Sequence, residues 1–209
     1  VHLNHKGGIV RADSRKNGSW AAVAPSTVRG QFIAVTNHGR GFRLETLHVG
    51  DKIADVRTLL PDGLNKGERV LTVTPTALAE GTSGGIAFGT RQGSVKISTP
   101  VWPKTSDEFN LISLADGDAI IGSAWVEDVK TAELAFLSSD TSLLIYPADK
   151  VRPQGLSGAG MAGIKLAAEH EVVAFGVIPT AEAASTMVVT VSDRMTGKQT
   201  PMSLYPRKG

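Results

Sequence analysis

Seven basic side chains recur at related places in a repeated pattern of this 209-residue chain. In each repeat a short apolar run leads through a turn into a second run, or into a glycine-rich excursion, that carries Lys or Arg. Cations at matching places in successive repeats form a continuous positive stripe, which suits a phosphate backbone contacted without regard to base sequence. The predicted stripe contains Arg40, Arg43, Arg91, Lys96, Lys150, Arg152 and Lys165.

Further phosphate contacts are predicted near the two ends of the chain, at Arg11, Arg15, Lys16, Arg207 and Lys208. The formal net charge is only +2, so the overall charge alone does not indicate a polyanionic partner. Ordinary solvated charges are therefore the alternative interpretation of the basic residues.

Two glycine-rich motifs could carry other chemistry, but their context does not favour it. Gly158-Ala-Gly160-Met-Ala-Gly163 matches a dinucleotide-binding fingerprint, with Glu182 about where a ribose-binding acid would lie. That fingerprint needs a strand directly before it and a helix directly after it, whereas Arg152-Pro153-Gln154-Gly155 precedes it here. Gly81-Thr-Ser83-Gly-Gly85 matches a nucleophile elbow, yet it leads into a hairpin, so a turn between repeats is the better interpretation.

The remaining candidates for catalysis or metal binding have structural explanations. Glu68, Asp118 and Glu171 are spread one per repeat, in steps of 50 and 53 residues, as expected of an acid that bonds backbone amides at a turn. The chain has no cysteine, and its five histidines show no ligand spacing apart from His2 and His5. We therefore expect no metal site and no catalytic residue. The three tryptophans could stack on bases or sugars, but core positions are more typical of Trp20, Trp102 and Trp125.

The elements that position these residues are short strands. The fullest repeat is Glu133–Phe175, with two β-rich runs around a turn, a basic excursion over Lys150–Lys165 and a last apolar run. Partial copies begin at Gln31 and Gly85, and they register at Thr36, Thr90 and Ser138. Asn4-His5-Lys6-Gly7 stands where Thr36-Asn37-His38-Gly39 stands later. A period near 50 residues with several short strands per unit indicates propeller-like blades.

The predicted fold class is therefore all-β, a single propeller-like domain over residues 1–209 with about five to six four-stranded antiparallel blades. The blades are expected at roughly 1–29, 30–83, 84–131, 132–184 and 185–209, with the first or the last incomplete. No segment has a sustained helical period, and the longest uncharged apolar run, near Val172–Thr180, is far too short to span a bilayer. The chain opens on Val1 rather than Met, so we expect it to be part of something longer.

Three segments also carry a family resemblance: residues 151–166, Ile33 to Arg40, and the closing Tyr205-Pro206-Arg207-Lys208-Gly209. Together with the repeats from Gln31 to Phe175, they resemble the C-terminal domain of the A subunits of bacterial DNA gyrase and topoisomerase IV, which are type IIA DNA topoisomerases. The resemblance implies a β-pinwheel, a propeller variant whose blades exchange strands and whose outer rim binds and bends double-stranded DNA.

The resemblance also sets expectations for the parent protein. It implies an ATP-dependent type II topoisomerase, an isomerase, whose cleaving tyrosine lies in the N-terminal cleavage domain, so that neither Tyr146 nor Tyr205 is a nucleophile. The implied partners are double-stranded DNA, that cleavage domain and the ATPase B subunit, with no membrane. No cofactor is expected in this domain, with ATP and Mg²⁺ used elsewhere in the parent, and the implied location is the bacterial cytoplasm at the nucleoid.

One departure from the gyrase pattern affects the expected activity. Gyrase carries a Gln-Arg-Arg-Gly-Gly-Lys-Gly type box in its first blade, and the nearest pieces here are Arg15-Lys16-Asn17-Gly18 and Arg207-Lys208-Gly209. The departure favours a topoisomerase IV type or divergent subunit that bends DNA without strong chiral wrapping. The alternative from another class is a propeller-type protein-interaction module, for which exposed aromatic residues are expected.

Overall fold

The computed structural model describes residues 1–11, 20–156 and 158–208, and within them the regular structure is strands and single 3₁₀ turns. The first sheet has the order β3-β1-β2-β6 and the second the order β10-β5-β4-β7. These strands are β1 (His2–Asn4), β2 (Gly8–Val10), β3 (Trp20–Val23), β4 (Gln31–Thr36), β5 (Arg40–Glu45), β6 (Ala54–Asp55), β7 (Val70–Thr74) and β10 (Glu108–Asn110).

The third sheet has the order β11-β8-β9-β14, the fourth the order β13-β12-β15, and the fifth pairs β16 with β17. Their strands are β8 (Gly85–Thr90), β9 (Ser94–Ser98), β11 (Ile120–Val126), β12 (Ala132–Ser138), β13 (Leu143–Pro147), β14 (Met161–Ala162), β15 (Val172–Pro179), β16 (Met187–Val191) and β17 (Gly197–Pro201). The 3₁₀ turns are η1 (Thr46–His48), η2 (Val56–Leu59), η3 (Val129–Thr131), η4 (Ala148–Lys150), η5 (Thr180–Glu182) and η6 (Met202–Leu204).

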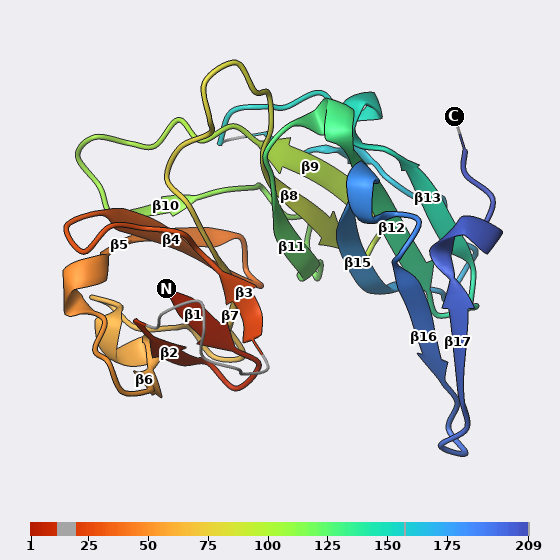
Figure 1. Ribbon diagram of the computed structural model, residues 1–209, viewed down its shortest axis with the longest axis horizontal. Helices are drawn as coiled ribbons and strands as arrows, with labels where there is room; N and C mark the ends of the chain where they lie inside the picture. Colours follow the sequence, from red (N-terminus) through yellow and green to blue (C-terminus); the bar gives the residue numbers. More distant parts are fainter. Residues whose placement is uncertain (12–19, 157, 209) are drawn as a thin grey trace.

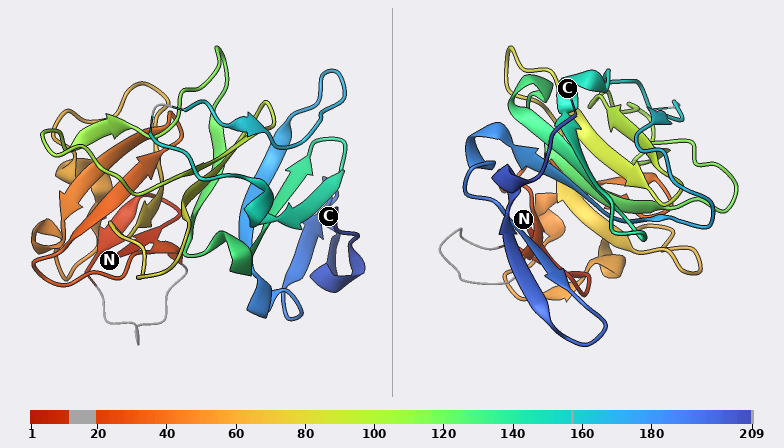
Figure 2. Two further views of the ribbon diagram at one scale, coloured as in Figure 1. Left: turned by 90° about the horizontal axis from the view of Figure 1, so that it is seen from above. Right: turned by 90° about the vertical axis from the view of Figure 1, so that its right-hand side faces the viewer.

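The all-β, propeller-like fold is confirmed, but the number of four-stranded blades is not. Among the described residues, three sheets have four strands, the fourth has three and the fifth is a two-stranded hairpin. The sheets follow one another along the molecule, from the red and orange N-terminal strands at one end to the blue β16–β17 hairpin at the other (Figure 1, Figure 2). No helix in the described part of the chain is long and apolar enough to cross a membrane.

The blades exchange strands, as the resemblance implies. The fourth strand of each complete sheet is two or three residues long and comes from a later part of the chain. Thus β6 follows the hairpin of the second sheet but pairs with β2 of the first, and β10 follows β9 but pairs with β5. Likewise β14 follows β13 but pairs with β9. The fourth strand of each of these sheets therefore lies in the chain segment that follows the hairpin of the next sheet. The predicted limits of the individual blades stay a prediction.

The predicted register of the hairpin turns agrees with the backbone. In the turns after β1, β4, β8, β12 and β16, the N–H of a residue with positive φ donates to the carbonyl three residues earlier. The acceptors are Asn4, Thr36, Thr90, Ser138 and Ser192, and the donors are Gly7, Gly39, Gly93, Thr141 and Met195.

The predicted register of the acidic marker is wrong by one residue in the third copy. In each of the three copies the turn contains one residue with positive φ: Gly67, Gly117 or Glu169. The N–H of the next residue closes that turn. Those next residues are Glu68, Asp118 and His170, whose N–H groups donate to carbonyls three residues earlier at 3.0, 3.1 and 3.2 Å. His170 rather than Glu171 therefore takes the place of the acid.

The apolar core lies between successive sheets, because the central strands bury both faces. In β4, Phe32 and Ala34 join the cluster shared with the first sheet, whereas Ile33 and Val35 join the cluster shared with the third. Between the third and fourth sheets, Phe175 of β15 packs against the backbone of two glycines. A Cβ on Gly89 would lie 2.3 Å from the Phe175 ring, and one on Gly122 would lie 2.5 Å from the Phe175 carbonyl oxygen.

This packing predicts a difference between two glycine substitutions. Gly122→Ala should lower the free energy of unfolding by about 1–3 kcal/mol, because the backbone oxygen at 2.5 Å cannot move aside without separating two sheets. Gly176→Ala in β15 is the matched control, since no heavy atom lies within 4 Å of its added Cβ, and its effect should stay within about 0.5 kcal/mol. Urea unfolding of both variants checks this, and equal destabilisation by the two would contradict the packing argument.

Candidate nucleic-acid interface

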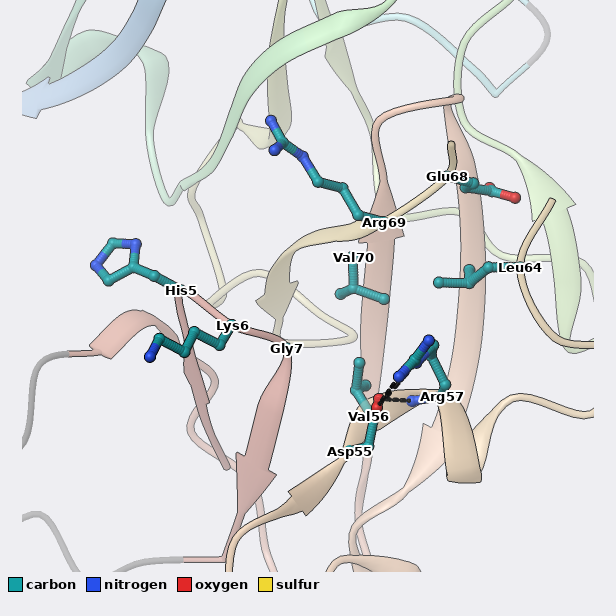
Figure 3. Close-up of a pocket in the computed structure, with 10 residues that line it drawn as sticks. All are labelled: His5, Lys6, Gly7, Asp55, Val56, Arg57, Leu64, Glu68, Arg69 and Val70. Carbon is teal, nitrogen blue, oxygen red and sulfur yellow. Dashed lines mark hydrogen bonds and ion pairs between the residues drawn. The ribbon is translucent and has the colours of Figure 1, made fainter. Parts of the chain in front are cut away.

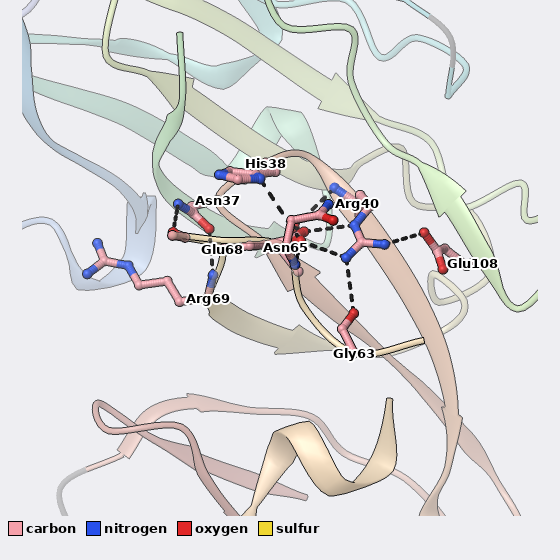
Figure 4. Close-up of polar contacts among 10 residues, drawn as sticks. Asn37, His38, Arg40, Gly63, Asn65, Glu68, Arg69 and Glu108 are labelled. Carbon is pink, nitrogen blue, oxygen red and sulfur yellow. Dashed lines mark hydrogen bonds and ion pairs between the residues drawn. The ribbon is translucent and has the colours of Figure 1, made fainter. Parts of the chain in front are cut away.

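Glu68 is a buried carboxylate that binds the hairpin of the second sheet (Figure 4). It accepts hydrogen bonds from Thr36 Oγ1 at 2.6 Å, from Arg40 Nε and Nη2 at 2.9 and 2.6 Å, and from the Asn65 N–H at 2.9 Å. Burial alone would raise the pKa of Glu68, but these hydrogen bonds outweigh it and lower the pKa to about 2. The acidic marker thus has the structural role that the sequence suggests at this copy.

Arg40, the first member of the predicted stripe, belongs to this hydrogen-bond network and does not face the solvent freely. Besides Glu68, its guanidinium donates to the Gly63 carbonyl at 3.1 Å and pairs with Glu108 on the exchanged strand β10 (Figure 4). It also lies over the Phe42 ring, 4.8 Å from the centroid, and its side chain is only 16% exposed. The hydrogen bond to Glu68 raises the pKa of Arg40, so the group stays charged and paired.

Two further members of the predicted stripe are also covered. Arg43 pairs with Asp107 at 3.1 Å, donates to the Pro103 carbonyl and is 14% exposed. Lys96 is fully buried, and this burial lowers its pKa to about 8. The physical reason is that the exchanged segments supply partners to these side chains: Asp107 directly precedes β10, and the excursion that contains β14 supplies carbonyl oxygens to Lys96. The structure therefore does not bring Arg40, Arg43 and Lys96 together in a surface stripe.

Three other predicted phosphate-binding residues are partly paired at the surface. Arg11 pairs with Asp51 at 3.0 Å, and Arg207 pairs with Glu133 at 2.7 Å. Arg91 lies 3.8 Å from Glu171, with nearly half of its side chain exposed. The pairs of Arg11 and Arg91 are exposed, and exposed ion pairs contribute little, so a phosphate could replace the carboxylate there. Two more of the predicted residues, Arg15 and Lys16, lie outside the described residues.

The last four predicted residues are exposed and have no side-chain hydrogen bond or ion pair within the described part of the chain: Lys150, Arg152, Lys165 and Lys208. Lys150 and Lys208 line one hollow of about 250 Å³ next to β14. Four cations without a carboxylate partner are the remainder of the stripe that could receive phosphates.

The basic excursion over Lys150–Lys165 follows the edge of the third sheet. Near its start the Gln154 N–H donates to the Ile97 carbonyl at 2.8 Å, and near its end the Gly163 N–H donates to the Gly93 carbonyl at 2.8 Å. Arg152 and Lys165 therefore flank opposite ends of β9, which at about 3.3 Å per residue is on the order of 17 Å long. That length corresponds to about five base pairs of duplex.

A second basic region, between the first and second sheets, is absent from the sequence-based set (Figure 3). This hollow of about 340 Å³ is lined by His5 and Lys6 from the turn after β1 and by Arg57 and Arg69 from the later connection. Arg57 pairs with Asp55, whereas the side chains of His5, Lys6 and Arg69 are exposed and have no partner among the described residues. The aligned turn at residues 4–7 contains the signal, but its cations lie at a turn tip, whereas the predicted stripe follows the second strands.

Curated relatives cover most of this chain with a small part of their own length. No protein-family model matches it. The A subunit of DNA gyrase from Deinococcus deserti is 32% identical over 187 residues, which are 85% of this chain and 22% of the relative. The A subunit of DNA gyrase from Pseudomonas aeruginosa is 31% identical over 146 residues, which are 68% of this chain and 15% of the relative. The chain thus spans about a fifth or less of the length of these two relatives.

Solved structures show the same fold. The C-terminal domain of DNA topoisomerase IV superposes with a TM-score of 0.75 at 16% identity, over 91% of this chain and 59% of that one. The DNA gyrase A C-terminal domain gives a TM-score of 0.61 at 19% identity, over 94% of this chain and 62% of that one. The E. coli ParC C-terminal domain gives 0.59 at 16% identity, over 83% and 70%. The predicted β-pinwheel fold is confirmed.

The buried carboxylate predicts a specific acid dependence of stability. The folded-state pKa of Glu68 lies near 2, below the ordinary value of 4.5, so its stabilising contribution is complete above pH 4.5 and is lost as the pH falls toward 2. Glu68→Gln should therefore cost about 3 kcal/mol of unfolding free energy at pH 7, and this difference from wild type should shrink toward pH 2. Urea unfolding across this pH range measures it, with the exposed Glu45→Gln as control. A cost that does not change with pH would contradict the assignment.

Proposed function

We propose that this chain, which is similar over most of its length to the A subunit of DNA gyrase, binds double-stranded DNA without sequence preference and bends it. The premise includes its fold, which is that of the topoisomerase IV and gyrase A C-terminal domains. The observation that carries the proposal is the set of unpartnered cations at the two ends of β9. Arg152 and Lys165 are exposed there, and the exposed Lys150 and Lys208 line the hollow next to β14.

The mechanism is charge neutralisation along a curved surface. Lys and Arg side chains that contact phosphates release condensed counterions and fix the duplex on the protein. Bending the duplex costs on the order of several kcal/mol, which contacts distributed along the surface offset. The hollow between the first and second sheets, with Lys6 and Arg69, supplies further cations toward the other end of the molecule. A bent segment could then be presented to an enzyme's DNA gate for strand passage.

The proposal extends to the whole protein of which this domain would be a part. That protein is the A-type subunit of a type IIA topoisomerase in the bacterial cytoplasm, where it acts at the nucleoid. Its N-terminal cleavage domain and an ATPase B subunit would supply the catalytic tyrosine, ATP and Mg²⁺. This domain itself would bind DNA and take no part in bond chemistry.

The alternative function, a protein-interaction module, receives less support. Such a module is expected to expose aromatic residues, which are enriched at protein interfaces. In the described part of the chain the exposed large apolar side chains are aliphatic or Met, such as Val101, Val189 and Met195, and none is aromatic. Fluorescence anisotropy with a labelled random-sequence duplex separates the two functions. The proposed function requires binding that weakens as salt increases, and absence of binding at low salt would refute it.

Replacing the cations at the two ends of the excursion should reduce the salt dependence. We expect the log–log slope of affinity against salt to change by roughly 0.9 for each phosphate that is no longer neutralised. Arg152→Ala/Lys165→Ala should therefore flatten it by about two units and weaken all duplex sequences alike, because phosphate contacts carry no base information. Anisotropy titrations on two unrelated duplexes over a range of salt concentrations measure this.

The matched control for this experiment is Arg194→Ala/Lys198→Ala, which removes two exposed cations from the β16–β17 hairpin, outside the excursion. Both double variants should keep wild-type unfolding free energies to within about 1 kcal/mol, since exposed charges contribute little. Equal loss of slope in the two double variants would mean that binding follows total charge and not the excursion.

The absence of a gyrase-type box in the sequence predicts weak chirality of the bend. In a ligation assay, with nicked plasmid closed in the presence of the protein, the linking number should shift only slightly at saturation. A large shift of one sign would show that this domain wraps DNA chirally without the box.

A further inference from the structure

Lys96 is a buried cation whose three N–H donors all bind backbone carbonyls. Its Nζ donates to Leu111 at 2.8 Å, to Leu156 at 2.8 Å and to Gly158 at 2.7 Å. An ammonium has three donors and no acceptor, so the group is fully satisfied. A phosphate outside the protein could reach this group only if these three bonds were broken and the site opened.

The acceptors belong to two segments that are far apart in sequence. Leu111 follows the exchanged strand β10, whereas Leu156 and Gly158 lie within the excursion between Arg152 and Lys165. Elsewhere the excursion is held by backbone bonds, from Gln154 to Ile97 and through β14 to β9. Between these two attachments, Lys96 holds the glycine-rich part against the sheet.

The sister repeats show that core packing alone does not call for a cation at this position. Lys96 lies opposite Phe88 in the β8–β9 pair. The equivalent residue in the second sheet is Phe42, opposite Ala34, and in the fourth sheet Leu144, opposite Phe136. Those two repeats thus place apolar side chains where the third places an ammonium. The third is also the repeat whose edge carries the basic excursion.

We infer that Lys96 is a positioning residue for DNA contact: its ammonium fixes the excursion on the edge of the third sheet so that Arg152 and Lys165 are held at a set separation along β9. The inference rests on the proposed function, since it concerns how that surface is arranged. A residue predicted as a phosphate contact is thereby given an internal role. Its chemistry, a cation among backbone carbonyls, orders a loop and does not read DNA.

The variant that tests this inference is Lys96→Met, which keeps an unbranched side chain and removes the donors. Its first readout is amide hydrogen exchange. Exchange should become faster at Gln154, Gly163 and Ile164, whose N–H groups bind the Ile97 and Gly93 carbonyls, and should stay unchanged in β12. The matched control is Lys150→Met, an exposed lysine without a side-chain partner in the described residues, which should leave exchange unchanged.

The second readout is a double-mutant cycle on DNA affinity and salt slope. Lys96→Met should weaken binding and flatten the slope about as much as Arg152→Ala/Lys165→Ala does. The triple variant should be no weaker than that double variant, because residues that act as a unit do not add. A residue with only a stability role would leave the affinity and the slope of the folded chain at their wild-type values, and an independent contribution to binding would give additive losses. Additive losses, or wild-type affinity and slope in Lys96→Met, would overturn the inference.

If Lys96→Met fails to fold, a second substitution tests the inference. Lys96→Gln keeps two N–H donors on a shorter side chain and should give intermediate values in both readouts. If the wild-type chain does not bind duplex DNA, the proposed function fails and the positioning role for DNA fails with it. If the wild type binds and only the Lys96 cycle is additive, the proposed function stands and the positioning role alone is refuted.

Discussion

The open edge of each hairpin is the constraint on which the rest of this structure depends. The second strands β2, β5 and β9 would each expose a row of unpaired N–H and C=O groups. In the first three sheets a strand of two or three residues from a later part of the chain pairs with that edge, namely β6, β10 and β14. Since each of these strands comes from the segment that leaves the next sheet, pairing an edge also ties neighbouring sheets together. The order of the sheets and their joint packing thus follow from one requirement of backbone hydrogen bonding.

The same constraint decides which cations face the solvent. Where an exchanged segment lies against a second strand, a cation on that strand finds its polar partners inside the protein. Arg40 does so with two carboxylates, Glu68 and Glu108, and Lys96 does so with three carbonyl oxygens. The segments that carry the exchanged strands lie outside the second strands. In the excursion, which pairs with the third sheet through β14, Arg152 and Lys165 stay exposed. Basic residues that look alike in the sequence therefore divide into an internal set and an external set.

Local turn chemistry is what the sequence predicts well. The hairpin turns at Thr36, Thr90 and Ser138 are closed by the same short hydrogen bonds, so their register follows from residue types alone. The one-residue error at Glu171 arises because the prediction matches charge, whereas the backbone repeats a positive φ that falls on Glu169 and not on glycine. The exchanged strands β6 and β14 could not be predicted, because two residues have no alternation to detect. The burial of Lys96 depends on the excursion that carries β14, so it could not be predicted from the sequence either. The hollow between the first two sheets is likewise a product of packing, which brings residues 5–7 next to residues 55–70.

The near-neutral composition also has a structural explanation. A formal net charge of +2 suggests little attraction for a polyanion, but the sum does not show which charges are paired and where the unpaired ones lie. Glu68 is buried and neutralised by Arg40, and Glu133, only 12% exposed, is paired with Arg207. At the excursion, by contrast, Lys150, Arg152 and Lys165 have no carboxylate partner within the described residues. The potential that a phosphate meets depends on unpaired charges within about 10 Å, a Debye length at ordinary salt, and not on the sum over the chain. A domain can therefore hold a duplex at one edge while its total charge stays close to zero.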